Sequence, residues 1–217
     1  MFHQKGYFRE QTKAEETANT LSHGLGLVAA LVGAPLLIMQ AARIGDTFFV
    51  VGASIFSLTI IFMYLSSSVY HFLPQGKAKH AFRVIEHCAI FLLIAGTYTP
   101  ILLGVLYGVW GWTLLAVVWG IALVGVFLKM FAQHLPLALS TSLYLLMGWI
   151  IIVAIVPLLT VMPIQGIYWL VAGGVCYSLG VLFFVLDGRL PFGHFIWHLW
   201  VLAGTTCHYF TVYWYGA

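Results

Sequence analysis

Residues 47–73 are TFFVVGASIFSLTIIFMYLSSSVYHFL, a stretch that contains no Asp, Glu, Lys or Arg. A helix needs about 20 consecutive apolar residues to cross the hydrocarbon core of a bilayer. The stretch is long enough and apolar enough to form such a helix. Its polar side chains gather in the last two turns, where Ser67 and His71 lie four residues apart and therefore on one face.

The rest of the chain has the same character. Only 7% of its residues are charged and 62% are hydrophobic, whereas soluble domains are about one quarter charged. No strand adjoins the glycines, which excludes a dinucleotide-binding loop. The sequence predicts an all-α integral membrane protein, a single domain over residues 1–217 built as a bundle of seven transmembrane helices. The seven apolar stretches are 20–42, 47–73, 82–103, 109–130, 137–160, 166–186 and 194–213.

The basic residues predict how the bundle is oriented. In a seven-span arrangement eight of the nine lie on one side: Lys5, Arg9, Lys13, Lys77, Lys79, Arg83, Lys129 and Arg189. Only Arg43 lies on the other. Because basic loops stay in the cytoplasm, we expect a multi-pass membrane protein with a cytoplasmic N-terminus and an outside C-terminus. Residues 1–19 are polar, form the cytoplasmic N-terminal segment and lack the apolar core of a cleavable signal peptide.

Three histidines form the candidate metal site. His194 and His198 are one helical turn apart at the start of the seventh span, and His71 ends the second. The predicted topology puts all three in the cytoplasmic half of the bilayer. Three imidazole nitrogens can hold a zinc ion and leave a fourth position open, as catalytic zinc requires. The alternative is a structural or proton-relay cluster without metal.

Two further side chains are candidate catalytic residues. Glu86 begins the third span on the same side, where it could take a proton from a water molecule that zinc activates. Ser67 could orient that water or a substrate carbonyl. The alternative for Glu86 is a first-turn carboxylate that the helix dipole stabilises. The alternative for Ser67 is a hydroxyl bonded to its own helix.

Glu15, Asn19 and His23 are spaced by four and line one face of a helix that enters the first span. They are possible accessory residues that cap or gate the same cavity. The alternative is a solvated amphipathic lead-in. Asp187 and Arg189 are interpreted as a boundary pair at the membrane interface.

Four ordered motifs resemble the bacterial haemolysin III branch of the progestin and adipoQ receptor family. They are the segment from Glu15 to Gly26, Ser67-x-x-x-His71, the segment from Glu86 to Pro100, and His194-x-x-x-His198. The resemblance implies a multi-pass protein of a bacterial inner membrane, a seven-helix bundle with its N-terminus inside. It also implies zinc on the three histidines, with Ser67 and Glu86 beside the metal. The family usually has Asp at the position of Glu86, and the extra methylene displaces the carboxylate by about one bond length.

Three functions are compatible with this pattern. The first is a zinc-dependent, ceramidase-like hydrolase that cleaves an amide or ester in a lipid entering from the inner leaflet, with Glu86 as base and Ser67 orienting the attack. The second is a sensor or regulator of membrane lipid state or energetics with a structural zinc. The third is a pore or transporter, which the single depth of the polar residues disfavours. A membrane lipid is the expected partner; nucleic acid is not, and no protein partner is predicted.

Overall fold

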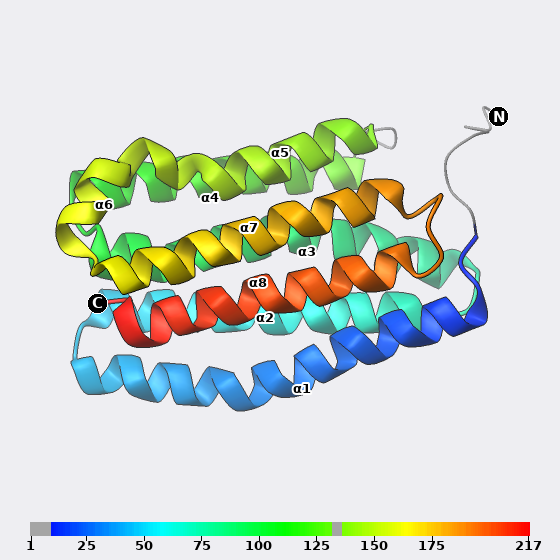
Figure 1. Cartoon of the computed structure of the whole chain (residues 1–217), viewed down its shortest axis with the longest axis horizontal. Coiled ribbons are helices and arrows are strands. Elements are labelled where there is room, and N and C mark those ends of the chain that lie inside the picture. Colours follow the sequence, from blue (N-terminus) through cyan, green and yellow to red (C-terminus); the bar gives the residue numbers. More distant parts are fainter. Residues whose placement is uncertain (1–9, 132–135) are drawn as a thin grey trace.

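A computed structural model describes residues 10–131 and 136–217 of the chain (Figure 1). These residues form eight α-helices and no strand, which confirms the all-helical class. A π-helical turn, Ile101–Val105, continues α3, and a 3-10 segment, Ile150–Ala154, joins α5 to α6. The helices are α1 Lys13–Ile44, α2 Thr47–Phe72, α3 Lys77–Pro100, α4 Val109–Phe131, α5 Leu137–Trp149, α6 Ile155–Val161, α7 Ile164–Leu186 and α8 Gly193–Tyr215.

Six of the resulting segments are long and apolar enough to cross a membrane. They are Lys13–Ile44, Thr47–Phe72, Lys77–Val105, Val109–Phe131, Leu137–Val161 and Ile164–Leu186. The chain is therefore a multi-span membrane protein. α8 has comparable length, but it carries His194, His198 and His208, and these three side chains lower its hydropathy.

The first helix begins earlier than the apolar stretch from which it was predicted. Thr12 is its N-cap, and a capping box forms in which Glu15 N donates to Thr12 Oγ1 (3.3 Å) and Thr12 N donates to Glu15 Oε2 (2.8 Å). Such a box satisfies two backbone donors that a helix start leaves free. Residues 13–19, which the sequence placed in a polar N-terminal segment, are thus the first turns of α1.

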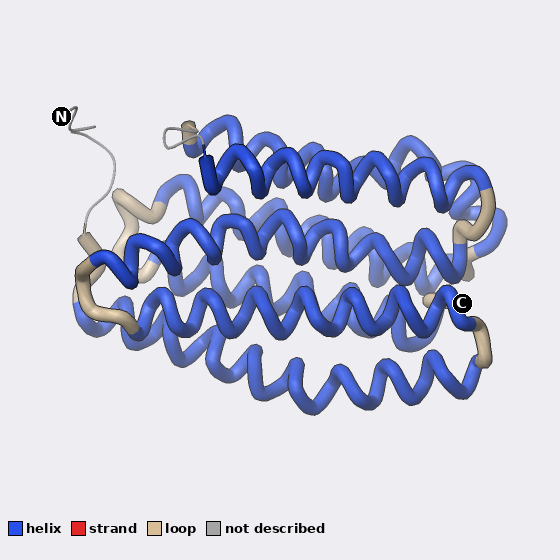
Figure 2. Tube along the Cα trace, turned by 180° about the vertical axis from the view of Figure 1, so that it is seen from behind, coloured by secondary structure: helices blue, strands red, loops and turns tan. Residues whose placement is uncertain are grey.

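The helices run roughly parallel and antiparallel along one axis, and the loops lie at the two ends (Figure 2). The start of α1 and the C-terminus lie at opposite ends (Figure 1). The core contains large side chains with almost no exposed surface: Leu37, Phe49, Phe56, Met63, Phe91, Leu102 and Met147. Leu and Val side chains cover the outside, as expected of a surface that faces lipid.

Glycine permits a close approach of α2 to α3. A methyl group added at Gly52 would lie 2.6 Å from Cα of Pro100, which is backbone and has little room to move. Small residues at helix interfaces allow such contacts in membrane bundles. The packing of α2 therefore depends on this glycine.

Gly52→Ala is expected to destabilise the fold by about 1–3 kcal/mol, because the added methyl overpacks the interface between α2 and α3. Thermal unfolding in detergent measures the change. Gly120→Ala in α4 is the matched control, since a methyl group there meets nothing within 4 Å. Equal melting temperatures for the two variants would contradict the close approach.

Candidate metal centre

Four buried side chains meet at the end of the bundle where α1 begins. His71 comes from the last turn of α2, Glu86 from α3, and His194 and His198 from the first turns of α8. One ligand atom from each lies within 4.8 Å of the others, so the group can hold a metal ion. The structure thus brings together the three predicted histidines and places the Glu86 carboxylate among them.

Two of the histidines are held by carboxylates. His71 Nδ1 is 2.7 Å from Glu16 Oε2, and His194 Nδ1 is 3.1 Å from Asp187 Oδ2. A carboxylate only accepts hydrogen bonds, so each Nδ1 carries a proton, and in the neutral ring Nε2 keeps its lone pair. Metal-binding histidines commonly donate their second ring N–H to a carboxylate in this way.

A hydroxyl holds His198, and it also places the ring proton on Nδ1. Ser22 Oγ donates to the carbonyl of Asn19 (2.9 Å) and lies 3.0 Å from His198 Nδ1. A hydroxyl has one proton, and here it points to the carbonyl. Ser22 therefore accepts from His198 Nδ1, which leaves Nε2 as an acceptor.

The Nε2 atoms of His71, His194 and His198 are all buried and have no hydrogen-bond partner among the described residues. Buried polar atoms without a partner are rare and costly. Three imidazole nitrogens without hydrogen-bond partners, gathered around one carboxylate, are the ligand atoms expected of a transition-metal site. The residues present therefore fit a metal ion, and this agreement does not depend on the family resemblance.

Ser67 connects the carboxylate to α1. Its hydroxyl donates to Glu86 Oε1 (2.6 Å), which in turn lies 3.6 Å from His71 Nε2. Ser67 also lies 2.7 Å from His23 Nδ1, and the His23 ring stacks on His198 at 3.6 Å. The alternative that Ser67 bonds to its own helix is wrong for this residue.

The neighbouring serines do show that behaviour. Ser66 donates to the carbonyl of Met63 and Ser68 to that of Tyr64. Only the middle serine of the three points toward α3. Of the three adjacent serines, only Ser67, which shares a helix face with His71, is therefore available to the cluster.

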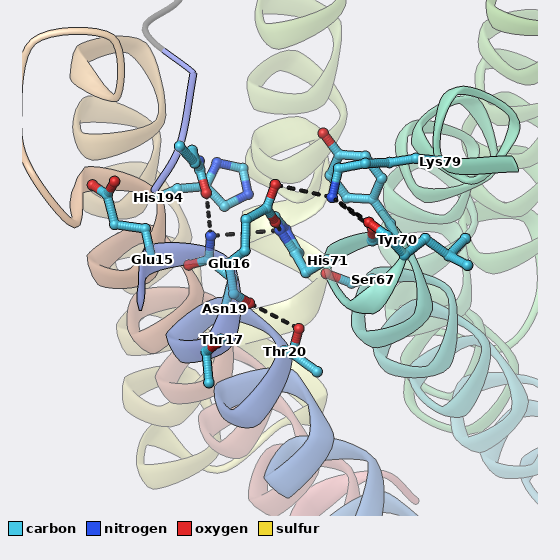
Figure 3. Close-up of polar contacts among 12 residues, drawn as sticks. Glu15, Glu16, Thr17, Asn19, Thr20, Ser67, Tyr70, His71, Lys79 and His194 are labelled. Carbon is cyan, nitrogen blue, oxygen red and sulfur yellow. Dashed lines mark hydrogen bonds and ion pairs between the residues drawn. The ribbon is translucent and has the colours of Figure 1, made fainter. Parts of the chain in front are cut away.

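The accessory residues separate into two groups. Asn19 and His23 lie beside the cluster, with Asn19 Nδ2 3.5 Å from His71 Nδ1. Glu15 binds the backbone N–H groups of Thr12 and Phe192. Figure 3 shows the adjacent Glu16 reaching toward His71 and Lys79, while Glu15 points to another side of α1.

Sequence reasoning missed Glu16, Ser22 and Asp187 as partners of the histidines. Asp187 pairs with His194 instead of serving only as a boundary residue. Partial burial raises the pKa of Asp187, but the hydrogen bonds from His194 and Gln11 outweigh it, so the net pKa is lowered. One signal was available for Glu16: it lies three and seven residues before Asn19 and His23, which is also a one-face spacing.

An apolar cavity of about 150 Å³ lies next to the cluster, between α3, α5, α7 and α8. Phe184 and Trp197 line it, and their rings are 6.2 and 4.7 Å from the ring of His194. Ile152 and Val171 also line it, and they are 55% and 42% exposed on the outside of the bundle. The cavity thus lies beside two rings that contact His194, and two of its lining residues are also exposed on the outside of the bundle.

The family model described as "Haemolysin-III related" matches residues 11–209. The chain belongs to the haemolysin III family. This family is a branch of the progestin and adipoQ receptor family, as the motifs suggested. The match spans nearly every described element, including all four residues of the cluster.

Relatives from bacteria and animals align with more than nine tenths of the chain. Hemolysin-3 of Bacillus cereus is 41% identical over 201 residues, which cover 93% of this chain and 91% of that protein. The Hemolysin-3 homolog of Bacillus subtilis (strain 168) is 41% identical and covers 94% and 95%. The human Monocyte to macrophage differentiation factor is 29% identical and covers 92% and 83%. No solved structure matches the chain.

Proposed function

We propose that this haemolysin III protein spans a bacterial inner membrane seven times, with the start of α1 in the cytoplasm and the C-terminus outside. α8 would be the seventh span, because its polar side chains face the bundle instead of lipid. The basic residues support the orientation: in the described chain Arg43 lies at the far end from the cluster, apart from Lys13, Lys77, Lys79, Arg83, Lys129 and Arg189. Lys5 and Arg9 lie outside the described residues.

The metal proposed for the cluster is zinc, held by His71, His194 and His198. Neutral imidazoles with a neighbouring carboxylate are a common donor set for zinc in proteins. A zinc ion bound there would supply a Lewis acid and would lower the pKa of a water molecule to near 7. All other chemistry falls to the side chains around it.

The proposed reaction is hydrolysis of a lipid amide or ester at the inner leaflet. The observation that carries it is the buried Glu86 carboxylate, which Ser67 holds among three unpaired histidine nitrogens. Glu86 would take the proton of the attacking water and deliver it to the leaving group. Ser67 would keep the carboxylate in place, and His23 would orient Ser67.

The apolar cavity supports a lipid as the substrate. Its lining beside Trp197 suits an acyl chain, and Ile152 and Val171 mark where that chain would enter from the bilayer. Pockets of this kind, apolar with a few convergent polar groups at one end, are typical of ligand sites. The scissile bond would lie at the histidines and the chain would extend toward the outer leaflet.

Metal removal tests the hydrolase. The purified protein is incubated with ceramide, an N-acyl phospholipid and an ester phospholipid, and fatty-acid release is measured. We expect release from one of these classes, its loss with a zinc chelator, and its return when zinc is added back. The chelator presaturated with zinc is the control. Turnover that survives removal of the metal would overturn the proposal.

A second candidate is a membrane sensor in which zinc only joins α2 to α8. The position of Glu86 favours it, because a carboxylate among three histidines could itself be the fourth ligand and close the site. Structural zinc sites are closed in this way. This candidate predicts bound zinc together with no turnover of any of the three lipid classes.

A further inference from the structure

The first turns of α1 supply the partners of His71 and His198, and Gln11 contacts the partner of His194. Of the seven buried residues in α1, four are polar and lie in these turns: Glu15, Asn19, Ser22 and His23. Most of the remaining helix surface is apolar and exposed. The start of α1 is therefore attached to the bundle through polar contacts that converge on the metal centre.

Glu16 links α1 to α2 and α3. Its Oε2 accepts from His71 Nδ1, and its Oε1 lies 2.9 Å from Lys79 Nζ. Lys79 is only 5% exposed and also donates to the carbonyls of Tyr70 and Leu73 at the end of α2 (3.0 and 3.2 Å). A buried amine with three acceptors holds the carboxylate firmly, so the orientation of His71 depends on this chain of contacts.

On the other side, the start of α1 holds the turn that presents His194. Gln11 Nε2 donates to Asp187 Oδ2 (3.1 Å), the same oxygen that pairs with His194 Nδ1. Glu15 Oε1 accepts from the backbone N–H of Phe192 (2.8 Å). Phe192 has a φ of 57°, the only positive φ of a non-glycine residue in the described ranges. Such a conformation persists only where the surroundings hold it.

We propose that residues 11–23, here called the α1 clamp, set the metal affinity of the centre: docking of the clamp orients the three histidines, and metal binding in turn stabilises the docked clamp. The inference rests on the proposed metal site but not on the proposed hydrolysis. Glu16 is its principal positioning residue. The coupling is reciprocal, because two equilibria that share contacts change each other by the same factor.

Zinc affinity of the purified full-length protein, measured by competition with a chromogenic chelator, tests the clamp. Glu16→Ala removes the acceptor of His71 and is expected to weaken affinity about 10–100-fold while saturating zinc still gives one ion per chain. Glu16→Gln keeps an acceptor oxygen and is expected to fall between Glu16→Ala and wild type. Glu10→Ala is the matched control, because Glu10 is an exposed carboxylate before the helix.

Hydrogen exchange provides the reciprocal measurement. Zinc is expected to slow exchange in residues 13–23 of the wild type and to slow it less in Glu16→Ala. Asp187→Asn is a second variant in case Glu16→Ala does not fold, because Asp187 lies outside the spanning helices. It is also expected to weaken zinc affinity.

The two proposals fail in different ways. Equal zinc affinity in wild type, Glu16→Ala and Asp187→Asn would overturn the clamp alone, as would zinc-independent exchange in residues 13–23. A wild type that binds no metal would overturn the metal site beneath it. Bound zinc without lipid turnover would leave the clamp standing and remove only the hydrolase.

Discussion

His198→Ala is expected to abolish tight metal binding and leave the purified protein with far less than one ion per chain. The substitution removes one of three nitrogen donors at the most buried position of the cluster, where His198 has no exposed surface. Binding free energy at a zinc site is shared among few ligands, so losing one weakens affinity on the order of 1,000-fold or more. Elemental analysis after gel filtration measures the ratio.

The control for this experiment is His208→Ala on the same helix. His208 is also buried, but it stacks on Tyr177 and lies about 15 Å further along α8 than His198. It is expected to retain the full metal content. Undiminished metal in His198→Ala would show that the ion, if present, is bound elsewhere.

Glu86→Gln is expected to lower lipid turnover by about 100–10,000-fold while the protein keeps its zinc. The amide has almost the shape of the carboxylate, and its oxygen can still accept from Ser67, but it cannot take up a proton at neutral pH. Turnover and metal content are measured on the same preparation. Glu86→Asp is the matched variant, because the family resemblance implies Asp at this position, and it is expected to remain active.

Two outcomes for Glu86→Gln would contradict its role as the base. Turnover equal to wild type would remove the carboxylate from the reaction. Loss of zinc together with loss of turnover would identify Glu86 as a ligand, and that result would favour the closed, structural site of the sensor.

The sequence was sufficient to predict that the histidines converge. Apolar stretches of spanning length show which segments cross the bundle, and consecutive spans run in opposite directions. His71 at the end of one stretch and His194 at the start of another must therefore lie at the same end of the bundle. The four-residue spacing then adds His198, and Glu86 follows from its place near the start of the third apolar stretch, although α3 itself begins earlier, at Lys77.

The hydrogen-bond partners of the histidines could not be predicted in the same way, because they depend on which side of α1 faces the cluster. Glu15 and Glu16 are adjacent, so their side chains diverge by about 100° around α1. Which of them faces His71 is decided by packing of the whole helix and by the capping box at Thr12. No sequence period distinguishes the two.

The contact between Asp187 and His194, and the lining of the cavity, involve backbone that departs from a regular α-helix. Asp187 reaches His194 because the turn between α7 and α8 closes through Phe192 in a left-handed conformation that bulky residues rarely adopt. The 3-10 segment Ile150–Ala154, which joins α5 to α6, contributes Ile151 and Ile152 to the lining of the cavity. Apolar stretches predict lengths of helices, not such interruptions.

X-ray absorption at the zinc edge of the purified wild-type protein tests the metal centre most directly. The proposed metal centre requires one zinc per chain with about three nitrogen neighbours near 2.0–2.1 Å, completed by oxygen and without sulfur. The nitrogen contribution should fall in His194→Ala. A wild-type protein without bound metal, or a zinc shell that contains sulfur, would contradict it.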